Sequence, residues 1–210
     1  LKKHALEAKF PQINESDMAD IIFTSGTTGK PKGVISTHVQ NIKVFDYWSS
    51  YIGLNEKDQY LIVNPFFHTF GYKAGWLASI MRGATAYPCP VFDADKIIEI
   101  INKEKISMLP GPPTLYQSIL TSNLIEIMDI SSLRLGVTGA ASIPVQLIKD
   151  MKEKLGFDTV ITAYGLTEST GVVTMCTPDD DYKTIATTSG CAIADVEVKC
   201  VNQDGQDIPA

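Results

Sequence analysis

Residues 133–161, LRLGVTGAASIPVQLIKDMKEKLGFDTVI, alternate between two kinds of apolar pattern. Residues 133–137 and 159–161 are short apolar runs, which are typical of strands buried on both faces. Between them, apolar residues recur at helical spacing from Pro144, which suits the first turn of a helix, to Gly156, which suits its end. A strand, a helix and a second strand in this order predict a parallel sheet covered by helices.

The same alternation continues along most of the chain. Short apolar runs that predict strands lie at residues 21–23, 60–63, 84–87 and 107–109. Helices are expected after Thr37 and Asp93 and over residues 74–81 and 112–120. The expected fold class is therefore α/β, with a mostly parallel sheet and covering helices.

The composition changes after residue 178. The acidic run 179–181 leads into a β-rich tail, in which residues 196–201 alternate as a strand would. We therefore expect an α/β core over residues 1–178 and the start of a smaller β subdomain over residues 179–210. Because the chain opens at Leu1 and stops soon after a strand that needs a partner, it is expected to be an internal fragment of a longer protein.

Charge and hydrophobicity exclude several classes of function. The 210 residues contain 18 Lys and Arg against 24 Asp and Glu, a net charge of −6 that argues against nucleic acid as a partner. The longest uncharged run, residues 106–125, is interrupted by prolines, so no integral membrane segment is expected. The four cysteines have neither metal-ligand nor C-x-x-C spacing, which predicts reduced thiols and a cytoplasmic protein.

A glycine-rich segment, TSGTTGKPKG at residues 24–33, is the most informative motif. It contains four hydroxyl side chains, three glycines and two lysines directly after a predicted strand. Glycines let backbone N–H groups approach phosphate oxygens, hydroxyls donate further hydrogen bonds, and lysine adds positive charge. The segment therefore predicts an anion-binding loop. Lys30 and Lys32 are expected to differ in role: one of them binds phosphate, and the sequence does not indicate which. The alternative interpretation is that both are solvated charges of a loop.

A phosphate-binding loop of the Walker A type is the main competing interpretation. That motif needs glycine at the position of Thr24 and a hydroxyl residue after Lys30. Pro31 stands there instead, where it would interfere with the helix that such a loop opens. A nucleotide hydrolase of this class is therefore disfavoured.

The segment resembles the signature of the adenylate-forming enzymes, a superfamily of acyl-CoA synthetases, luciferases and peptide-synthetase adenylation domains. The resemblance extends along the whole chain and implies the fold of their large N-terminal domain. It implies that the loop binds the phosphates of ATP, through the nucleotide-binding residues Thr24, Ser25, Gly26, Thr27, Thr28, Gly29, Lys30 and Lys32.

Two further motifs follow predicted strands in the order of that superfamily. AYGLTE at residues 163–168 offers an aromatic ring, a glycine, a hydroxyl and a carboxylate, although a core tyrosine beside a surface turn is the alternative. The resemblance assigns Tyr164 and Gly165 to the nucleotide, Thr167 to the α-phosphate and Glu168 to Mg²⁺. TGAASIP at residues 138–144 resembles the segment that lines the adenine and carboxylate pocket, here with Gly139, Ala140 and Ala141, or is alternatively a plain strand-to-helix turn.

The segment FFHTFG, residues 66–71, is similar to one found in acyl-CoA synthetases. A histidine among aromatic residues is often a core residue, but the resemblance places His68 near the reacting carboxylate, so His68, Thr167 and Glu168 are the expected catalytic residues.

The implied activity is that of an AMP-forming acid–thiol ligase using ATP, Mg²⁺ and coenzyme A on a small-molecule carboxylic acid. The fragment alone is expected to be inactive, and a homodimer is possible. A peptide-synthetase-type adenylation domain that loads a carrier protein, or a non-catalytic nucleotide-binding module, is the alternative. Fatty, aryl and alicyclic acids all stay open as substrates.

Overall fold

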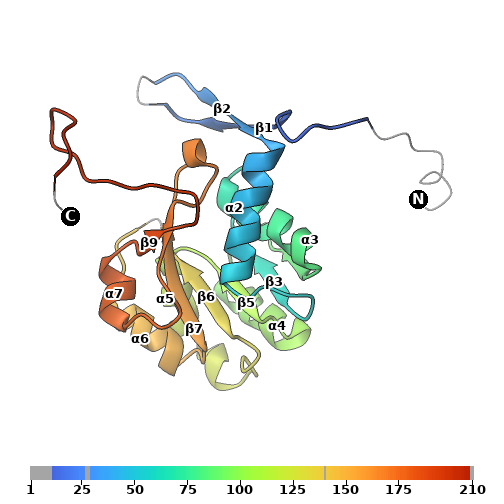
Figure 1. Ribbon diagram of the computed structural model, residues 1–210. Helices are drawn as coiled ribbons and strands as arrows, with labels where there is room; N and C mark the ends of the chain where they lie inside the picture. Colours follow the sequence, from blue (N-terminus) through green and yellow to red (C-terminus); the bar gives the residue numbers. More distant parts are fainter. Residues whose placement is uncertain (1–10, 27–28, 140, 209–210) are drawn as a thin grey trace.

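The computed structural model describes residues 11–26, 29–139 and 141–208 (Figure 1). Its main sheet has seven strands: β3 (Gln59–Ile62), β4 (Thr85–Pro88), β5 (Met108–Pro110), β6 (Leu135–Thr138), β7 (Thr159–Tyr164), β8 (Thr174–Met175) and β9 (Cys191–Ala192). Their order is β4-β3-β5-β6-β7-β8-β9; the first five strands pair in parallel, and β8 and β9 are antiparallel additions at one edge. The expected α/β class with a mostly parallel sheet is confirmed.

The helices form two groups around this sheet. One group consists of α4 (Ala94–Glu104), α5 (Pro113–Leu120), α6 (Val145–Glu153) and α7 (Tyr182–Thr187), which contact one another in that order. The second consists of α2 (His38–Tyr51), the π-helix η1 (Phe70–Leu77) and α3 (Ala78–Arg82). Helix α4 illustrates why the sequence folds this way: the Asp93 carboxylate caps it by accepting the Lys96 N–H, and its three buried residues are isoleucines one turn apart or adjacent.

A separate hairpin precedes the main sheet. It is formed by β1 (Met18–Thr24) and β2 (Lys32–Thr37), which pair antiparallel, so that the glycine-rich segment is the tip of this hairpin. Figure 1 shows the hairpin projecting from the end of α2, away from the main sheet. Helix α2 begins as expected after Thr37, whose hydroxyl accepts the Gln40 N–H while the Gln40 side chain accepts the Thr37 N–H.

The helix expected over residues 74–81 begins earlier than predicted. The chain is π-helical from Phe70 to Leu77 and becomes α-helical only in α3. The carbonyl of Ala74 accepts hydrogen bonds from the Trp48 indole at 3.3 Å and the Tyr60 hydroxyl at 3.0 Å, and these side-chain partners favour the wider helix. Long-range partners of this kind leave no trace in local periodicity.

The strand expected over residues 196–201 is wrong. Within the described residues, only Val201 makes a ladder contact there, a single bridge to Asp207 across a turn. Val198 and Val201 are exposed, so alternating apolar residues find no surface to cover. Within the range 179–210, α7 packs on α6 and β7, and β9 joins the main sheet. The division of the chain at residue 178 stays a prediction.

A buried ion pair joins the amino-terminal ends of three parallel strands. Asp58, directly before β3, is 2% exposed and accepts hydrogen bonds from Arg134 Nε at 2.8 Å and Ser107 Oγ at 2.7 Å. Burial raises the pKa of Asp58, but the hydrogen bonds from Arg134, Ser107 and the Asn55 backbone outweigh it, so the pKa lies below its ordinary value.

Replacing Asp58 by asparagine is expected to lower the free energy of unfolding at pH 7 by about 2 kcal/mol, because charged hydrogen bonds to Arg134 are lost. The folded-state pKa is lower than that of an unfolded aspartate, about 3.9. The stabilisation is therefore complete above that value and disappears as the pH falls through the folded pKa. In urea titrations of both proteins between about pH 7 and pH 3, the difference in the free energy of unfolding is expected to shrink towards the acid end; a difference that grows on acidification would contradict this.

Candidate functional site

A pocket opens at the carboxyl ends of β6 and β7, the edge of a parallel sheet at which α/β proteins bind ligands. Its cavity volume is about 190 Å³. It is lined by residues from α2, η1, the two strands and the turns that follow them: Phe45, Trp48, His68, Thr69, Phe70, Ala74, Val137, Thr138, Gly139, Ala163, Tyr164, Gly165, Thr167, Gly171 and Val172. Three sequence motifs that are far apart along the chain therefore meet in one cavity.

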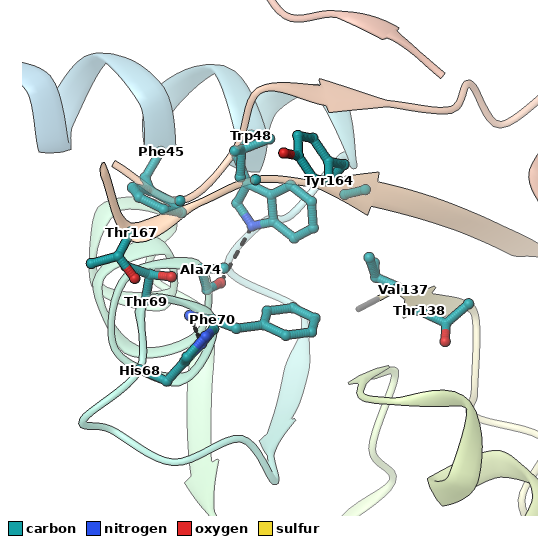
Figure 2. Close-up of a pocket in the computed structure, with 15 residues that line it drawn as sticks. Phe45, Trp48, His68, Thr69, Phe70, Ala74, Val137, Thr138, Tyr164 and Thr167 are labelled. Atoms are coloured by element: carbon teal, nitrogen blue, oxygen red, sulfur yellow. Dashed lines mark hydrogen bonds between the residues drawn. The ribbon is translucent and has the colours of Figure 1, made fainter. Parts of the chain in front are cut away.

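The interior of the pocket is aromatic and apolar. Figure 2 shows the rings of Trp48 and Phe70 pointing into the same space, with Val137 across from them. The Trp48 indole N–H donates to the Ala74 carbonyl, which fixes the ring against η1. None of the lining residues is Asp, Glu, Lys or Arg. The interior is therefore suited to an uncharged, largely apolar group.

His68 lies at the rim of this pocket. Its side chain is exposed, so the interpretation as a core histidine is wrong. Nδ1 accepts a hydrogen bond from the Phe70 N–H at 3.1 Å. Because Nδ1 is an acceptor, the neutral ring bears its proton on Nε2, the nitrogen that is left for a ligand.

The motif at residues 163–168 begins in β7 and ends in a short 3₁₀ turn, η3 (Thr167–Ser169). Tyr164 is 46% exposed and Thr167 lines the pocket, so the interpretation as a core tyrosine is also wrong. Gly165 packs so tightly that a Cβ there would lie 2.0 Å from the Gly171 carbonyl oxygen. Glu168 is exposed and does not line the cavity itself.

The segment after β6 contributes backbone to the pocket. Gly139 lines it and approaches β7 so closely that a Cβ would lie 2.6 Å from the Ala163 carbonyl oxygen. Ala141 is exposed and is not a lining residue, while Ala140 is outside the described residues. The Thr138 hydroxyl is buried without a hydrogen-bond partner in the described part of the chain. Because Gly139 packs this closely against β7, we interpret the segment as part of the pocket wall and not as a plain strand-to-helix turn.

The glycine-rich segment lies beyond the pocket, at the tip of the hairpin. Gly26 has φ +63°, and a Cβ there would lie 2.3 Å from the Lys30 carbonyl oxygen, so the tight turn requires glycine. Lys30 and Lys32 are exposed, as are Ser25 and Gly29, and Thr24 ends β1. Thr27 and Thr28 lie outside the described residues.

The chain continues from this segment into a strand, which excludes the Walker A interpretation. In a Walker loop the segment opens a helix, and the N-terminus of that helix binds phosphate. Here Lys32 is already the first residue of β2 and pairs with Thr24. β2 also contacts η3, so this strand of the hairpin lies beside the turn that contains Thr167 and Glu168.

Sequence reasoning missed several residues of the site. Phe45 and Trp48 have the spacing of ordinary core positions on α2, and both are buried. Gly171 has φ +125°, and a Cβ there would lie 3.1 Å from the Phe45 ring, so a larger residue would fill the cavity. A glycine three residues after the YGLTE motif was the one signal available for it.

The described residues contain neither a cluster of metal ligands nor a helix that could span a membrane. No group of three or more His, Cys, Asp or Glu side chains in the described ranges is arranged to hold a metal ion. No helix in the same ranges has the length and apolar composition needed to cross a membrane. The four cysteines are all free.

Comparisons with known proteins agree on one family. The family model described as AMP-binding enzyme matches residues 2–210. The chain is 48% identical over 197 residues to a 3-[(3aS,4S,7aS)-7a-methyl-1,5-dioxo-octahydro-1H-inden-4-yl]propanoyl:CoA ligase of Rhodococcus jostii, with 94% of this chain and 38% of that protein covered. It is 46% identical over 202 residues to the protein of the same name from Mycobacterium tuberculosis, with 96% of this chain and 40% of that protein covered. The chain thus spans about two fifths of the length of these relatives.

Solved structures have the same fold. The anthranilate CoA ligase AuaEII, in complex with anthranoyl-AMP, superposes with a TM-score of 0.84 at 28% identity, over 93% of this chain and 38% of that one. The inhibitor-bound N-terminal domain of FACL13 from Mycobacterium tuberculosis superposes with a TM-score of 0.84 at 29% identity, over 96% of this chain and 50% of that one.

Proposed function

The chain belongs to the family of AMP-binding enzymes, and on that premise we propose that the full-length protein is an AMP-forming acid–thiol ligase. In the first step a carboxylate oxygen attacks the α-phosphorus of ATP, pyrophosphate leaves, and an acyl-adenylate forms. In the second step the thiol of coenzyme A attacks the acyl carbon, and AMP leaves. The observation that supports this most is that His68, Gly139, Tyr164 and Thr167 line one cavity.

The proposed roles follow from where these side chains lie. The exposed ring of Tyr164 offers a stacking surface for adenine at the pocket mouth, and the Thr167 hydroxyl is available to the α-phosphate. His68 Nε2–H is available to donate to the carboxylate or to the oxygen on which charge develops. The lysines of the hairpin tip offer charge to the outer phosphates. These groups act by positioning and electrostatics, the main means of catalysis in phosphate chemistry.

The residues of the site suit Mg²⁺ only when the phosphates of ATP supply further ligands to the ion. The described residues contain no multi-carboxylate cluster, and Glu168 is a single exposed carboxylate beside Thr167. Mg²⁺ is commonly bound by one or two carboxylates together with substrate phosphates and water, so Glu168 suits that role. When bound, the ion would offset the charge that builds up on pyrophosphate.

The acid that we propose as substrate has a compact, apolar, ring-containing body. The aromatic interior has no charged lining residue and is closed by Trp48 against η1. The two relatives named above are ligases for a bicyclic diketone with a propanoyl side chain, which has this shape and polarity. That bicyclic propanoate is therefore the first acid to test.

The proposed reaction is tested by incubating the full-length protein with Mg·ATP, coenzyme A and a pool of acids that includes the bicyclic propanoate. Mass spectrometry is expected to find AMP together with one new acyl-CoA. AMP without an acyl-CoA would indicate a carrier-protein acceptor, as in peptide synthetases. ADP and phosphate would overturn the proposal, and ATP binding without turnover would indicate a binding module.

Trp48 is expected to limit the size of the acid. In Trp48→Ala the inner wall of the pocket is removed, so the ratio of kcat/KM for a larger acid to that for the bicyclic propanoate is expected to rise by about tenfold or more. Steady-state assays on a panel of linear and cyclic acids measure this. Trp48→Phe keeps an aromatic wall and serves as the control with a smaller shift. An unchanged ratio in Trp48→Ala would contradict the placement of the acid.

A cytoplasmic location and a homodimer stay predictions. Four free cysteines are compatible with a reducing compartment. Light scattering on the full-length protein tests the dimer, and fractionation of cells tests the location.

A further inference from the structure

Lys73 is a buried charged residue whose position the proposed reaction leaves unexplained. It lies on η1, five residues after His68, and its side chain is 0% exposed. Lysine is almost never fully buried unless its charge is paired. Burial lowers the pKa of Lys73, and the neighbouring Asp20 carboxylate opposes that shift. A lysine at this place therefore needs a specific set of partners.

The Lys73 ammonium has three such partners, two hydrogen-bond acceptors and one ion-pair carboxylate. Nζ lies 2.9 Å from Ser36 Oγ, 2.8 Å from Asn41 Oδ1 and 3.2 Å from Asp20 Oδ1. The Asn41 amide in turn donates to Asp20 Oδ2 at 2.6 Å, which closes the cluster. A planar guanidinium does not reproduce three donors that diverge from one atom, so arginine is a poor substitute here.

These partners come from three different elements. Asp20 is in β1, Ser36 in β2 and Asn41 in α2. Few residues of the hairpin are buried: among its described residues only Ser36 is buried, whereas Phe23 is 71% and Ile35 is 61% exposed. Few apolar side chains of the hairpin are therefore fixed by burial, whereas the polar cluster at its base is largely buried.

We propose that Lys73 is a positioning residue that fixes the hairpin to η1 and thereby holds the glycine-rich segment at a set place relative to the pocket. The inference rests on the proposed function, because the segment matters as a phosphate-binding loop. Two neighbours of the pocket are connected through this cluster. His68 lies two residues before η1, and β2 contacts the η3 turn with Thr167 and Glu168. A hairpin released at its base would misplace the loop and leave the apolar pocket intact.

The test compares Lys73→Met and the neutral double variant Asp20→Asn/Lys73→Met with wild type in the full-length protein. Lys73→Met is expected to accelerate amide hydrogen exchange in β1 and β2 by about tenfold or more, with β7 unchanged. It is also expected to raise KM for ATP by about tenfold or more, with KM for the acid within about twofold. In the double variant, thermal stability is expected to recover while hairpin exchange and the KM for ATP stay raised.

Arg134→Met is the matched control. It also removes one partner of a buried ion pair, but at the amino-terminal ends of the strands, on the edge opposite the pocket. It is expected to lower stability without changing hairpin exchange or the KM for ATP. The inference is overturned if Lys73→Met leaves hairpin exchange unchanged, or if it raises both KM values equally as a generally destabilised protein would. If wild type forms no AMP, the proposed function fails, while the exchange data still decide whether Lys73 anchors the hairpin.

Discussion

Replacing Glu168 by alanine is expected to slow acyl-adenylate formation by about 10²–10³, the loss typical of one preorganised group that stabilises developing charge. Glu168 is the carboxylate of the η3 turn, directly after the Thr167 hydroxyl at the pocket. Without it, the metal that accompanies ATP loses its one proposed protein ligand. The rate of ATP–pyrophosphate exchange in the full-length protein, measured across Mg²⁺ concentrations, reports this step without coenzyme A.

Glu126→Ala is the control for this prediction. Glu126 is also an exposed glutamate in a short 3₁₀ helix, the Asn123–Glu126 turn, but it is not a pocket residue. Its exchange rate is expected to equal that of wild type. An unchanged rate for Glu168→Ala at saturating Mg²⁺ would remove Glu168 from the proposed site.

Replacing Gly165 by alanine is expected to reduce adenylation by about 10²-fold, because the turn between Tyr164 and Thr167 must move. The added Cβ would lie 2.0 Å from the Gly171 carbonyl oxygen and 2.8 Å from the Val172 Cα, both backbone atoms that cannot rotate away. Tyr164 and Thr167, which are assigned to adenine and the α-phosphate, lie one residue before and two residues after this glycine and would shift with it. Single-turnover formation of acyl-adenylate measures the loss.

Gly53→Ala separates this steric effect from backbone strain. Gly53 has φ +63°, so alanine is strained there, but no atom lies within 4 Å of the added Cβ. It is expected to cost about 1 kcal/mol of stability, as a positive φ does for a residue with a side chain, and to leave adenylation unchanged. Equal activity losses in the two variants would attribute the Gly165 effect to general destabilisation.

Local signals predicted the parts of the fold that local contacts build. Asp93 caps α4 and Thr37 caps α2 as their sequences indicate, since a cap involves only neighbouring residues. Strand β2 was missed because residues 32–37 have a weak apolar pattern, and they become a strand through pairing with β1. The π-helical start of η1 was missed because Trp48 and Tyr60, which are distant in sequence, bind its Ala74 carbonyl.

The residues of the candidate site likewise fall into two groups: those that short motifs predict and those that only the assembled fold brings together. The motif residues His68, Tyr164 and Thr167 were predicted from short motifs that resemble those of a known superfamily, and all three line one pocket. Trp48 was not predicted, because a wall of a cavity looks like any core residue along a helix. Lys73 was not predicted either, since Asp20, Ser36 and Asn41 approach it only when β1, β2 and α2 are assembled.

The central claim is that a carboxylate oxygen attacks the α-phosphorus of ATP at this pocket. The most direct measurement uses the full-length protein and an acid labelled with oxygen-18 in both carboxylate oxygens, with Mg·ATP and coenzyme A. Because coenzyme A attacks the acyl carbon, the bridging oxygen leaves with AMP. We expect mass spectrometry to find AMP with one oxygen-18 and pyrophosphate with none. Unlabelled AMP, or ADP together with labelled phosphate, would contradict the account.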